Sequence, residues 1–465
     1  MIGLINNNSS SEINVKDCYS TSNINSTGDY IGGLVGWVSS AADKPAVKIT
    51  SCYHTTGFVT GKDYVGGLIG FAGKAEITGS TYVNCDVAGN DYVGGLIGIY
   101  SLCGKLEITG TSDVNIKSTG TVTGHNNVGG LIGSAEENSS GSTQISFCCS
   151  ETLVTGNQYV GGLVGSMSGG RIDNSTISAD NSYSSGAVKG NTSVGGLAGS
   201  VDNKVIIISC HSSSDVSLKE SSTSSPQYFG GLIGYCSVSA VEDSYSKGNV
   251  SVNINNGSNI GGLIGGINLY SGPTSVLKCF HSNGKVTGWG DVGGLIGLIY
   301  PGDVSNKATI EQCFANCEVN AGNSLAGGLI GHINNTEILN CYSRGKVTGN
   351  NFIGGLIGSG TGTSKIKYCY AAYNSSDLSV VSYVGGLVGG GTIDNITSSF
   401  YSGITNTYGN FVNIDNLKSI YTYTSSPDTS INWSIGIEDA TSVPTTWLIS
   451  SQNDGFPILT QNPPR

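Results

Sequence analysis

Residues 31–36 of this chain read Ile-Gly-Gly-Leu-Val-Gly, and this phrase decides the fold. The pattern of an apolar residue, Gly-Gly-Leu, a second apolar residue and Gly occurs twelve times, and the last copy covers residues 384–389. Copies recur about every 32 residues, a period typical of stacked repeat architectures. We therefore interpret most of the 465 residues as one repeat array rather than as several ordinary domains.

One repeat, residues 49–70, shows the local structure that each copy predicts. It contains three short runs rich in strand-forming residues, 49–53, 58–61 and 64–70, separated by turn residues. No stretch has helical periodicity. Short strands repeated in one direction predict an all-β fold, a parallel β-solenoid (β-helix) of about 12 coils. A β-propeller fits less well, because propellers usually have about 4 to 8 blades.

The repeat pattern ends before the C-terminus. We assign residues 1–411 to the repeat solenoid and 412–465, which contain Trp433 and Trp447, to a C-terminal capping segment. Residues 2–5 resemble the end of a further repeat and do not form a signal peptide. We therefore expect the chain to be part of a longer protein.

Composition excludes several classes of partner. Charged residues make up 11% of the chain and the formal net charge is −11, with no cluster of basic residues. Nucleic-acid binding depends on clustered Lys and Arg, so we expect none. No apolar run approaches the roughly 20 residues of a membrane span, so we expect no membrane insertion.

Cysteines recur at one place in the repeat. Several of the 13 lie 14 residues before a glycine pair or close to that offset. Most precede an aromatic residue, as in Cys52-Tyr53 and Cys341-Tyr342, and other repeats place Ser or Thr there. An interior ladder of small side chains is the simplest interpretation. Disulfides between neighbouring coils and, less readily, a metal site remain as alternatives.

The glycine pair itself predicts architecture rather than chemistry. Strict alternation along residues 64–70 would place aliphatic side chains on both faces. Either this strand is covered on both sides, or, as we favour, the pair bends the chain or marks a tight packing contact. A phosphate-binding loop is the alternative, but it needs a helix N-terminus, and no helix is expected.

An aromatic residue often stands two positions before the first glycine of the pair. If exposed, these side chains would form a surface stripe suited to stacking on sugars or on a partner, and if buried they would be core rungs. Polar residues occupy the same position in other repeats, which indicates partial exposure. The candidate stripe consists of Tyr30, Tyr64, Tyr92, Tyr159, Tyr228, Phe352 and Tyr383.

No catalytic, cofactor-binding or metal-binding constellation emerges from the sequence. The five histidines are scattered, and no nucleophile motif is present. Asp29, Asp63 and Asp91 share one offset and could bind Ca²⁺ together, but later repeats have other polar residues there. A solvated turn position is the simpler interpretation of these three aspartates.

Whole units resemble the GLUG-motif repeat family. Residues 341–349 read Cys-Tyr-Ser-Arg-Gly-Lys-Val-Thr-Gly, residues 353–358 read Ile-Gly-Gly-Leu-Ile-Gly, and the resemblance covers about residues 18–403. It implies a large extracellular bacterial protein, adhesin-like or accessory to an immunoglobulin A-specific metalloprotease. The zinc motif HExxH of such proteases is absent here, so their activity does not carry over.

These observations predict a non-enzymatic structural or adhesive rod, extracellular or on a cell or particle surface, without cofactors. Its partners would be glycans or protein surfaces, bound by loops between repeats, with 136–146, 213–227 and 300–307 as the candidates. The alternatives are a polysaccharide-active enzyme on a β-helix scaffold and a self-assembling fibre or surface-layer component that associates end to end.

Overall fold

A computed structural model describes the chain over most of the repeat array. The described residues are 2–41, 43–102, 104–111, 113, 116–137, 142–173, 183–220, 226–302, 305–373, 383–402, 410–411, 417, 435–437, 446–449 and 456–459. The chain divides into two compact units, unit 1 with residues 1–240 and unit 2 with residues 241–465. Each unit is described by itself.

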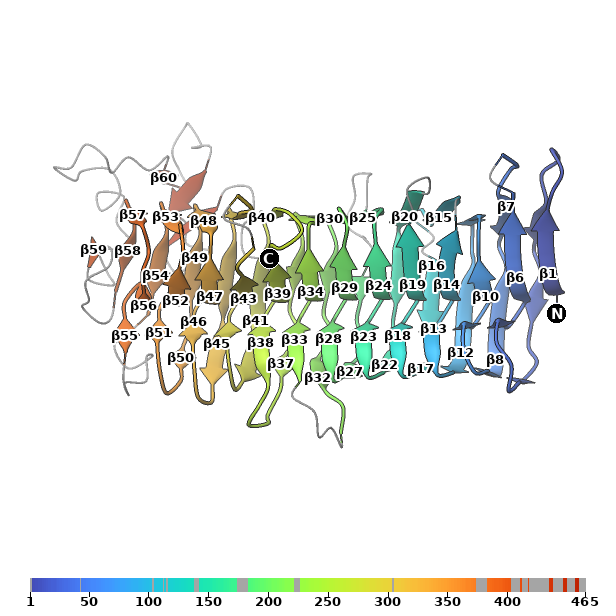
Figure 1. Ribbon diagram of the computed structural model, residues 1–465, viewed down its shortest axis with the longest axis horizontal. Helices are drawn as coiled ribbons and strands as arrows, with labels where there is room; N and C mark the ends of the chain where they lie inside the picture. Colours follow the sequence, from blue (N-terminus) through green and yellow to red (C-terminus); the bar gives the residue numbers. More distant parts are fainter. Residues whose placement is uncertain are drawn as a thin grey trace. The chain divides into compact units, whose positions relative to one another are not determined.

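Both units are all-β, and their strands stack in parallel as a β-solenoid (Figure 1). The described residues form about 11 turns, close to the 12 coils expected, and contain no helix. The predicted fold class is therefore confirmed. Consistent with this, the described part of the chain offers no helix long and apolar enough to span a membrane.

Each complete coil has four walls rather than the three strands expected from sequence. In one coil of unit 1, the walls are β11 (Ala75–Thr78), β12 (Tyr82–Ala88), β13 (Asp91–Gly94) and β14 (Ile97–Leu102). We number the walls one to four in this order. Every wall pairs in parallel with the same wall of the neighbouring coil, as in β11 with β15 (Lys105–Thr109).

The third and fourth walls carry the site described below. In unit 1 the third wall consists of β5 (Ile31–Gly32), β9 (Val65–Gly66), β13, β18 (Asn126–Gly129), β23 (Gln158–Gly161), β28 (Thr192–Gly195) and β33 (Gln227–Gly230). The fourth wall consists of β1 (Ile2–Asn7), β6 (Val35–Ser40), β10 (Ile69–Ala72), β14, β19 (Ile132–Glu137), β24 (Val164–Ser168), β29 (Ala198–Asp202) and β34 (Ile233–Ser237).

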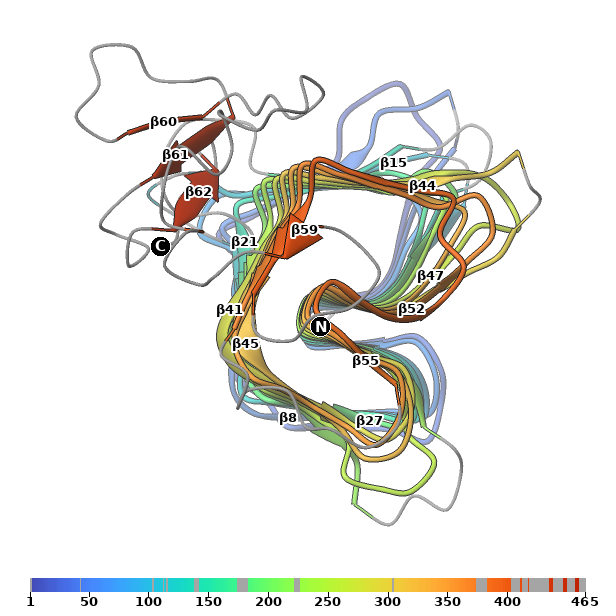
Figure 2. The ribbon, with the colours of Figure 1, turned by 90° about the vertical axis from the view of Figure 1, so that its left-hand side faces the viewer.

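Unit 2 repeats the arrangement. Its third wall contains β38 (Ser258–Gly261), β42 (Val292–Gly293), β46 (Ala326–Gly327), β51 (Ile353–Gly354) and β55 (Val384–Gly385). Its fourth wall contains β39 (Ile264–Asn268), β43 (Ile296–Tyr300), β47 (Ile330–Asn334), β52 (Ile357–Thr361) and β56 (Val388–Gly391). Figure 2 shows the chain turning sharply between the third wall, where β55 is labelled, and the fourth wall, where β52 is labelled.

Residues 64–70 form two short strands rather than one, because Gly67-Leu68 bends the chain between β9 and β10. The bend resets which side of the chain faces inward. Val65, Leu68 and Ile69 are therefore all fully buried, which explains the apolar residues on both sides of the glycine pair. The phrase thus marks the bend that was one of its two predicted roles.

The second glycine of the pair also makes a contact that excludes a side chain, which was the other predicted role. A Cβ on Gly95 would collide with the carbonyl oxygen of Gly130 in the next coil and with Ser118 Oγ across the interior. In unit 2, a Cβ on Gly262 would collide in the same way with the buried His281 ring. The interior width at this level leaves room only for hydrogen.

Cysteines form the expected interior ladder. All cysteines among the described residues are free thiols, and all but Cys18 are buried. The amide of Cys313 donates to Cys341 Sγ at 3.4 Å, and this thiol donates to the carbonyl of Leu339 at 3.1 Å. Ser244 holds the same place in its coil and donates to the carbonyl of Glu242 at 2.7 Å. The position therefore takes a small side chain that can bond to a carbonyl at the corner.

Aromatic residues that follow the cysteine position stack on the outside of the second wall. In unit 2, β41 (Phe280–Gly288), β45 (Phe314–Ala321), β49 (Tyr342–Arg344) and β54 (Tyr370–Ala372) align Phe280, Phe314, Tyr342 and Tyr370 at spacings of 4.7 to 5.0 Å.

The described part of the C-terminal tail covers this stack. Trp447 begins β61 (Trp447–Ile449), and its indole donates to Asn340 Oδ1 at 3.2 Å. Tyr370 donates to the carbonyl of Pro457, the first residue of β62 (Pro457–Leu459), at 2.7 Å. These tail residues therefore pack on the flank of the coils, and the predicted capping of the open end by 412–465 stays a prediction.

Candidate binding groove

The last glycine of the phrase creates a groove between the third and fourth walls. A Cβ on Gly234 would lie 2.6 Å from the carbonyl carbon of Ser193 in the preceding coil and 2.6 Å from Gly199 O. Backbones of the two walls therefore touch at this line. Side chains on either side of the contact face each other across an external groove. The rings of Tyr30 and Trp37, for example, have their centres 4.7 Å apart.

Residues two before the glycine pair enter the groove through an unusual backbone conformation. We call this position the slot. Tyr159 has a φ of 55°, Ser193 of 53° and Tyr228 of 64°, all in the left-handed region. This conformation costs a side-chain-bearing residue about 1 kcal/mol or more, and here it turns the slot residue out of the strand's alternation. The slot residue and the residue before it therefore both face away from the interior, as Gln158 and Tyr159 do, whereas the residue after the slot, such as Val194, is fully buried.

At the start of unit 1 the slot is filled by stacked tyrosines. The rings of Tyr30 and Tyr64 are 4.8 Å apart, and those of Tyr64 and Tyr92 are 5.0 Å apart. Trp37 and Phe71 pack beside them from the fourth wall, 4.5 Å apart. Each ring face is covered by the next ring, so this part of the stripe presents ring edges to solvent.

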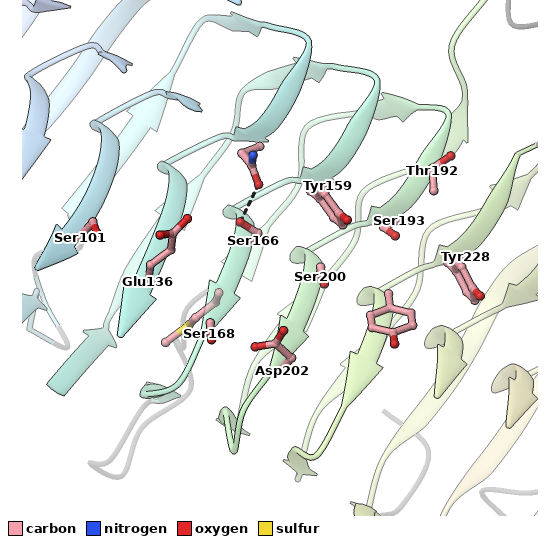
Figure 3. Close-up of a pocket in the computed structure, with 13 residues that line it drawn as sticks. Ser101, Glu136, Tyr159, Ser166, Ser168, Thr192, Ser193, Ser200, Asp202 and Tyr228 are labelled. Carbon is pink, nitrogen blue, oxygen red and sulfur yellow. Dashed lines mark hydrogen bonds between the residues drawn. The ribbon is translucent and has the colours of Figure 1, made fainter. Parts of the chain in front are cut away.

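Further along unit 1 the stack is interrupted and the groove opens into a pocket of about 630 Å³. Its lining includes Ser101, Asn127, Glu136, Tyr159, Ser166, Met167, Ser168, Thr192, Ser193, Ser200, Asp202, Tyr228 and Tyr235. Figure 3 shows Tyr159 and Tyr228 on one side of the pocket and the fourth-wall strands with Ser200 and Asp202 on the other.

Hydroxyl groups and carboxylates supply the polar part of the pocket. Ser166 Oγ donates to Asn127 Oδ1 at 2.7 Å, the dashed line in Figure 3. It also lies 2.9 Å from Ser134 Oγ. Glu136 and Asp202 are exposed at the pocket and give it a negative potential. Burial raises the pKa of the neighbouring Tyr92, and the Glu136 carboxylate adds to this shift. The pocket combines apolar ring surface with hydroxyl donors and anionic acceptors.

The remaining stripe residues lie in unit 2. Phe352 and Tyr383 stack at 4.7 Å with nearly parallel planes, and Tyr383 is 58% exposed. Asp291 occupies the slot of another coil, and burial raises the pKa of its carboxyl to about 6. The seven predicted stripe residues therefore share one structural position, but only Tyr159 and Tyr228 line the pocket of unit 1.

The three aspartates considered for Ca²⁺ serve the turns between coils. Asp29 Oδ1 accepts the amide of Asp63 at 3.3 Å, and Asp91 Oδ1 accepts the amide of Asn126 at 3.1 Å. Lys62 lies 3.2 Å from Asp63. Across the described ranges, no three His, Cys, Asp or Glu side chains form a group that could hold a metal ion. Their geometry fits the solvated turn position.

Sequence reasoning missed the fourth-wall side of the groove. The position after the last glycine holds Trp37, Phe71, Ser166, Ser200 and Tyr235, and its aromatic members were the available signal. The candidate loops 136–146, 213–227 and 300–307 include residues 138–141, 221–225 and 303–304, which lie outside the described residues.

A comparison with protein-family profiles agrees with the repeat pattern. The sequence profile of the GLUG motif matches residues 156–182 and 322–348, and no curated protein matches the chain. A crystal structure of a candidate immunoglobulin A1 protease from Bacteroides ovatus aligns at 12% identity over 87% of this chain and 85% of that chain. The TM-score of this alignment is 0.23. One match to the GLUG motif lies inside each unit, which is consistent with a GLUG-motif repeat family.

Proposed function

We propose that this chain is a non-enzymatic adhesive repeat protein that acts outside a cell or on a particle surface and binds glycans in the groove of unit 1. The observation that carries the proposal is the lining of the pocket. Tyr159 and Tyr228 offer apolar ring surface, while serine hydroxyls and two carboxylates surround them. Sugars need this combination, because they bury C–H faces and must keep their hydroxyls hydrogen-bonded.

Size and rigidity also support binding of a glycan. A volume of about 630 Å³ lies within the range of about 300 to 1,000 Å³ usual for ligand pockets. The slot residues sit at strand ends, and β23, β28 and β33 are held in register by parallel pairing on both sides of β28. Little ordering is therefore needed on binding. Display outside a cell rests on the resemblance of the repeats alone.

A glycan array probed with the full chain, followed by a reducing-sugar assay on each bound glycan, tests this function. We expect binding without release of sugar. The variant Ser200→Trp should block binding, and it should fold because Trp37 holds the same position in the first coil. Asn84→Trp, on the exposed face of β12, is the matched control and should bind normally. Released sugar would overturn the non-enzymatic assignment.

A polysaccharide-active enzyme is the second candidate, and Glu136 and Asp202 favour it. They sit on β19 and β29, with β24 between them, so their backbones are about 10 Å apart. Glycoside hydrolysis uses two carboxyl groups, one with a pKa raised by burial. Both side chains are exposed here, which favours binding over catalysis. If sugar is released, Glu136→Gln and Asp202→Asn should each stop the release.

A further inference from the structure

The stack of slot residues in unit 1 has a gap at Ser193, which lies between Tyr159 and Tyr228 in the two neighbouring coils. Gln158 pairs with Thr192 and Val160 with Val194, so Tyr159 and Ser193 are neighbouring rungs. The same register between β28 and β33 makes Tyr228 the next rung. Ser193 is only 3% exposed and forms the floor between two tyrosines that both line the pocket.

The gap has the thickness of one ring. Two coil spacings, about 9.6 Å, separate the rungs of Tyr159 and Tyr228. At the start of the unit, Tyr64 fills an equivalent interval between Tyr30 and Tyr92, with ring centres 4.8 and 5.0 Å away. A ring inserted above Ser193 would therefore contact a tyrosine on each face at an ordinary stacking distance.

The other interruption of the stack is already occupied by protein. Asn127 stands between the Tyr92 and Tyr159 rungs, and its amide oxygen accepts from Ser166 at 2.7 Å. Ser193 carries a much smaller side chain at the equivalent place. Across the groove from it, Ser200 pairs in register with Tyr235, and the Tyr235 ring packs edge-on to Tyr228 at 5.2 Å. The Ser193 gap is therefore the place where a ligand ring can enter.

We propose that the Ser193 gap is a single-ring subsite that holds one uncharged or cationic pyranose between Tyr159 and Tyr228. This rests on the glycan-binding function and adds the position and class of the sugar. A pyranose has an apolar C–H face on each side and hydroxyls around its rim. Thr192 and Ser200 can donate to these hydroxyls, and Asp202 accepts from them. Carboxylates at the pocket repel uronic and sialic acids.

The subsite is tested by completing the stack. Ser193→Tyr places in this coil the residue that six other coils carry in the slot, so the variant should fold with an unchanged melting temperature. Isothermal titration with chitohexaose, cellohexaose, mannohexaose and hexagalacturonate supplies the probes. The best neutral probe should bind Ser193→Tyr at least about ten-fold more weakly than wild type. Ser193→Ala, which keeps the gap, should bind within about three-fold of wild type.

The outcomes separate this inference from the function on which it rests. If no glycan binds the wild-type chain, the glycan-binding function itself fails. If Ser200→Trp abolishes binding and Ser193→Tyr leaves it intact, the function stands and the subsite is overturned. Stronger binding of hexagalacturonate than of the neutral probes would overturn the assigned charge class. Displacement of the bound sugar by tyrosinamide at lower concentration than by free sugar would assign the gap to an aromatic peptide side chain instead.

Discussion

Each coil has an interior face and a groove face, and the two differ in how much the amino acid at a given repeat position can vary. Inside, the second glycine of the pair does not vary, because a Cβ on Gly95 would collide with Ser118 and with the next coil. In the groove, the slot varies among tyrosine, phenylalanine, leucine, asparagine, serine and aspartate from one coil to the next. The repeated phrase is therefore set by backbone contact, whereas a ligand site can arise where the repeat is broken.

The interior rule predicts the largest effect. Gly95→Ala must push apart Gly130 O and Ser118 Oγ, and we expect it to lower the free energy of unfolding by about 3 kcal/mol or more. Gly28→Ala is the matched control, because the nearest atom to its added Cβ is Ser26 Oγ at 3.5 Å. Urea denaturation followed by circular dichroism measures both. Equal stability of the two variants would refute the contact argument.

The groove predicts a pH-dependent effect at Asp291. Burial raises the pKa of this carboxyl to about 6 in the folded state, so folded protein holds the proton more tightly than unfolded protein does. Stability therefore falls as pH rises from about 4 to about 6, by up to about 3 kcal/mol. Asp291→Asn cannot ionise and should melt at a higher temperature than wild type at neutral pH.

At about pH 3 the two proteins should melt alike, because Asp291 is then mostly protonated in both the folded and the unfolded chain. Thermal melts of wild type and Asp291→Asn at neutral pH and at acidic pH measure the difference in melting temperature between the two proteins. A constant offset between variant and wild type across the pH range would exclude ionisation of Asp291 as its cause.

The sequence predicted the fold well because the Gly-Gly-Leu phrase recurs twelve times at a nearly constant spacing. It found the slot residues but not the groove, for two physical reasons. A tyrosine at positive φ, such as Tyr159, breaks the alternation that sequence reasoning assumes. Where β10 pairs with β6, Gly70 has no partner and Phe71 lies beside Trp37. Phe71 therefore faces the groove, whereas strict alternation from the buried Ile69 would place it in the interior. Packing of Trp447 against Tyr370 depends on tertiary contacts that no local pattern encodes.

Opening the filled part of the groove should have a smaller effect on stability. Tyr64→Ser removes the middle ring from the Tyr30–Tyr64–Tyr92 stack and copies the arrangement around Ser193. Loss of two stacked contacts should cost about 1 to 2 kcal/mol. The variant should also gain a second sugar site, seen as a doubled stoichiometry in titration with the best neutral probe. An unchanged stoichiometry would mean that a ring-sized gap alone does not make a subsite.

The smallest effect is expected where the interior tolerates exchange. Cys341→Ser replaces a thiol that donates to Leu339 O with a hydroxyl that can make the same bond, as Ser244 does to Glu242 O. We expect a loss below about 1 kcal/mol. Cys341→Val keeps the apolar character but leaves the Leu339 carbonyl and the Cys313 amide without this partner, so it should cost more. If valine were tolerated better than serine, apolar burial rather than hydrogen bonding would define this rung, and the interior rule would be one of volume alone.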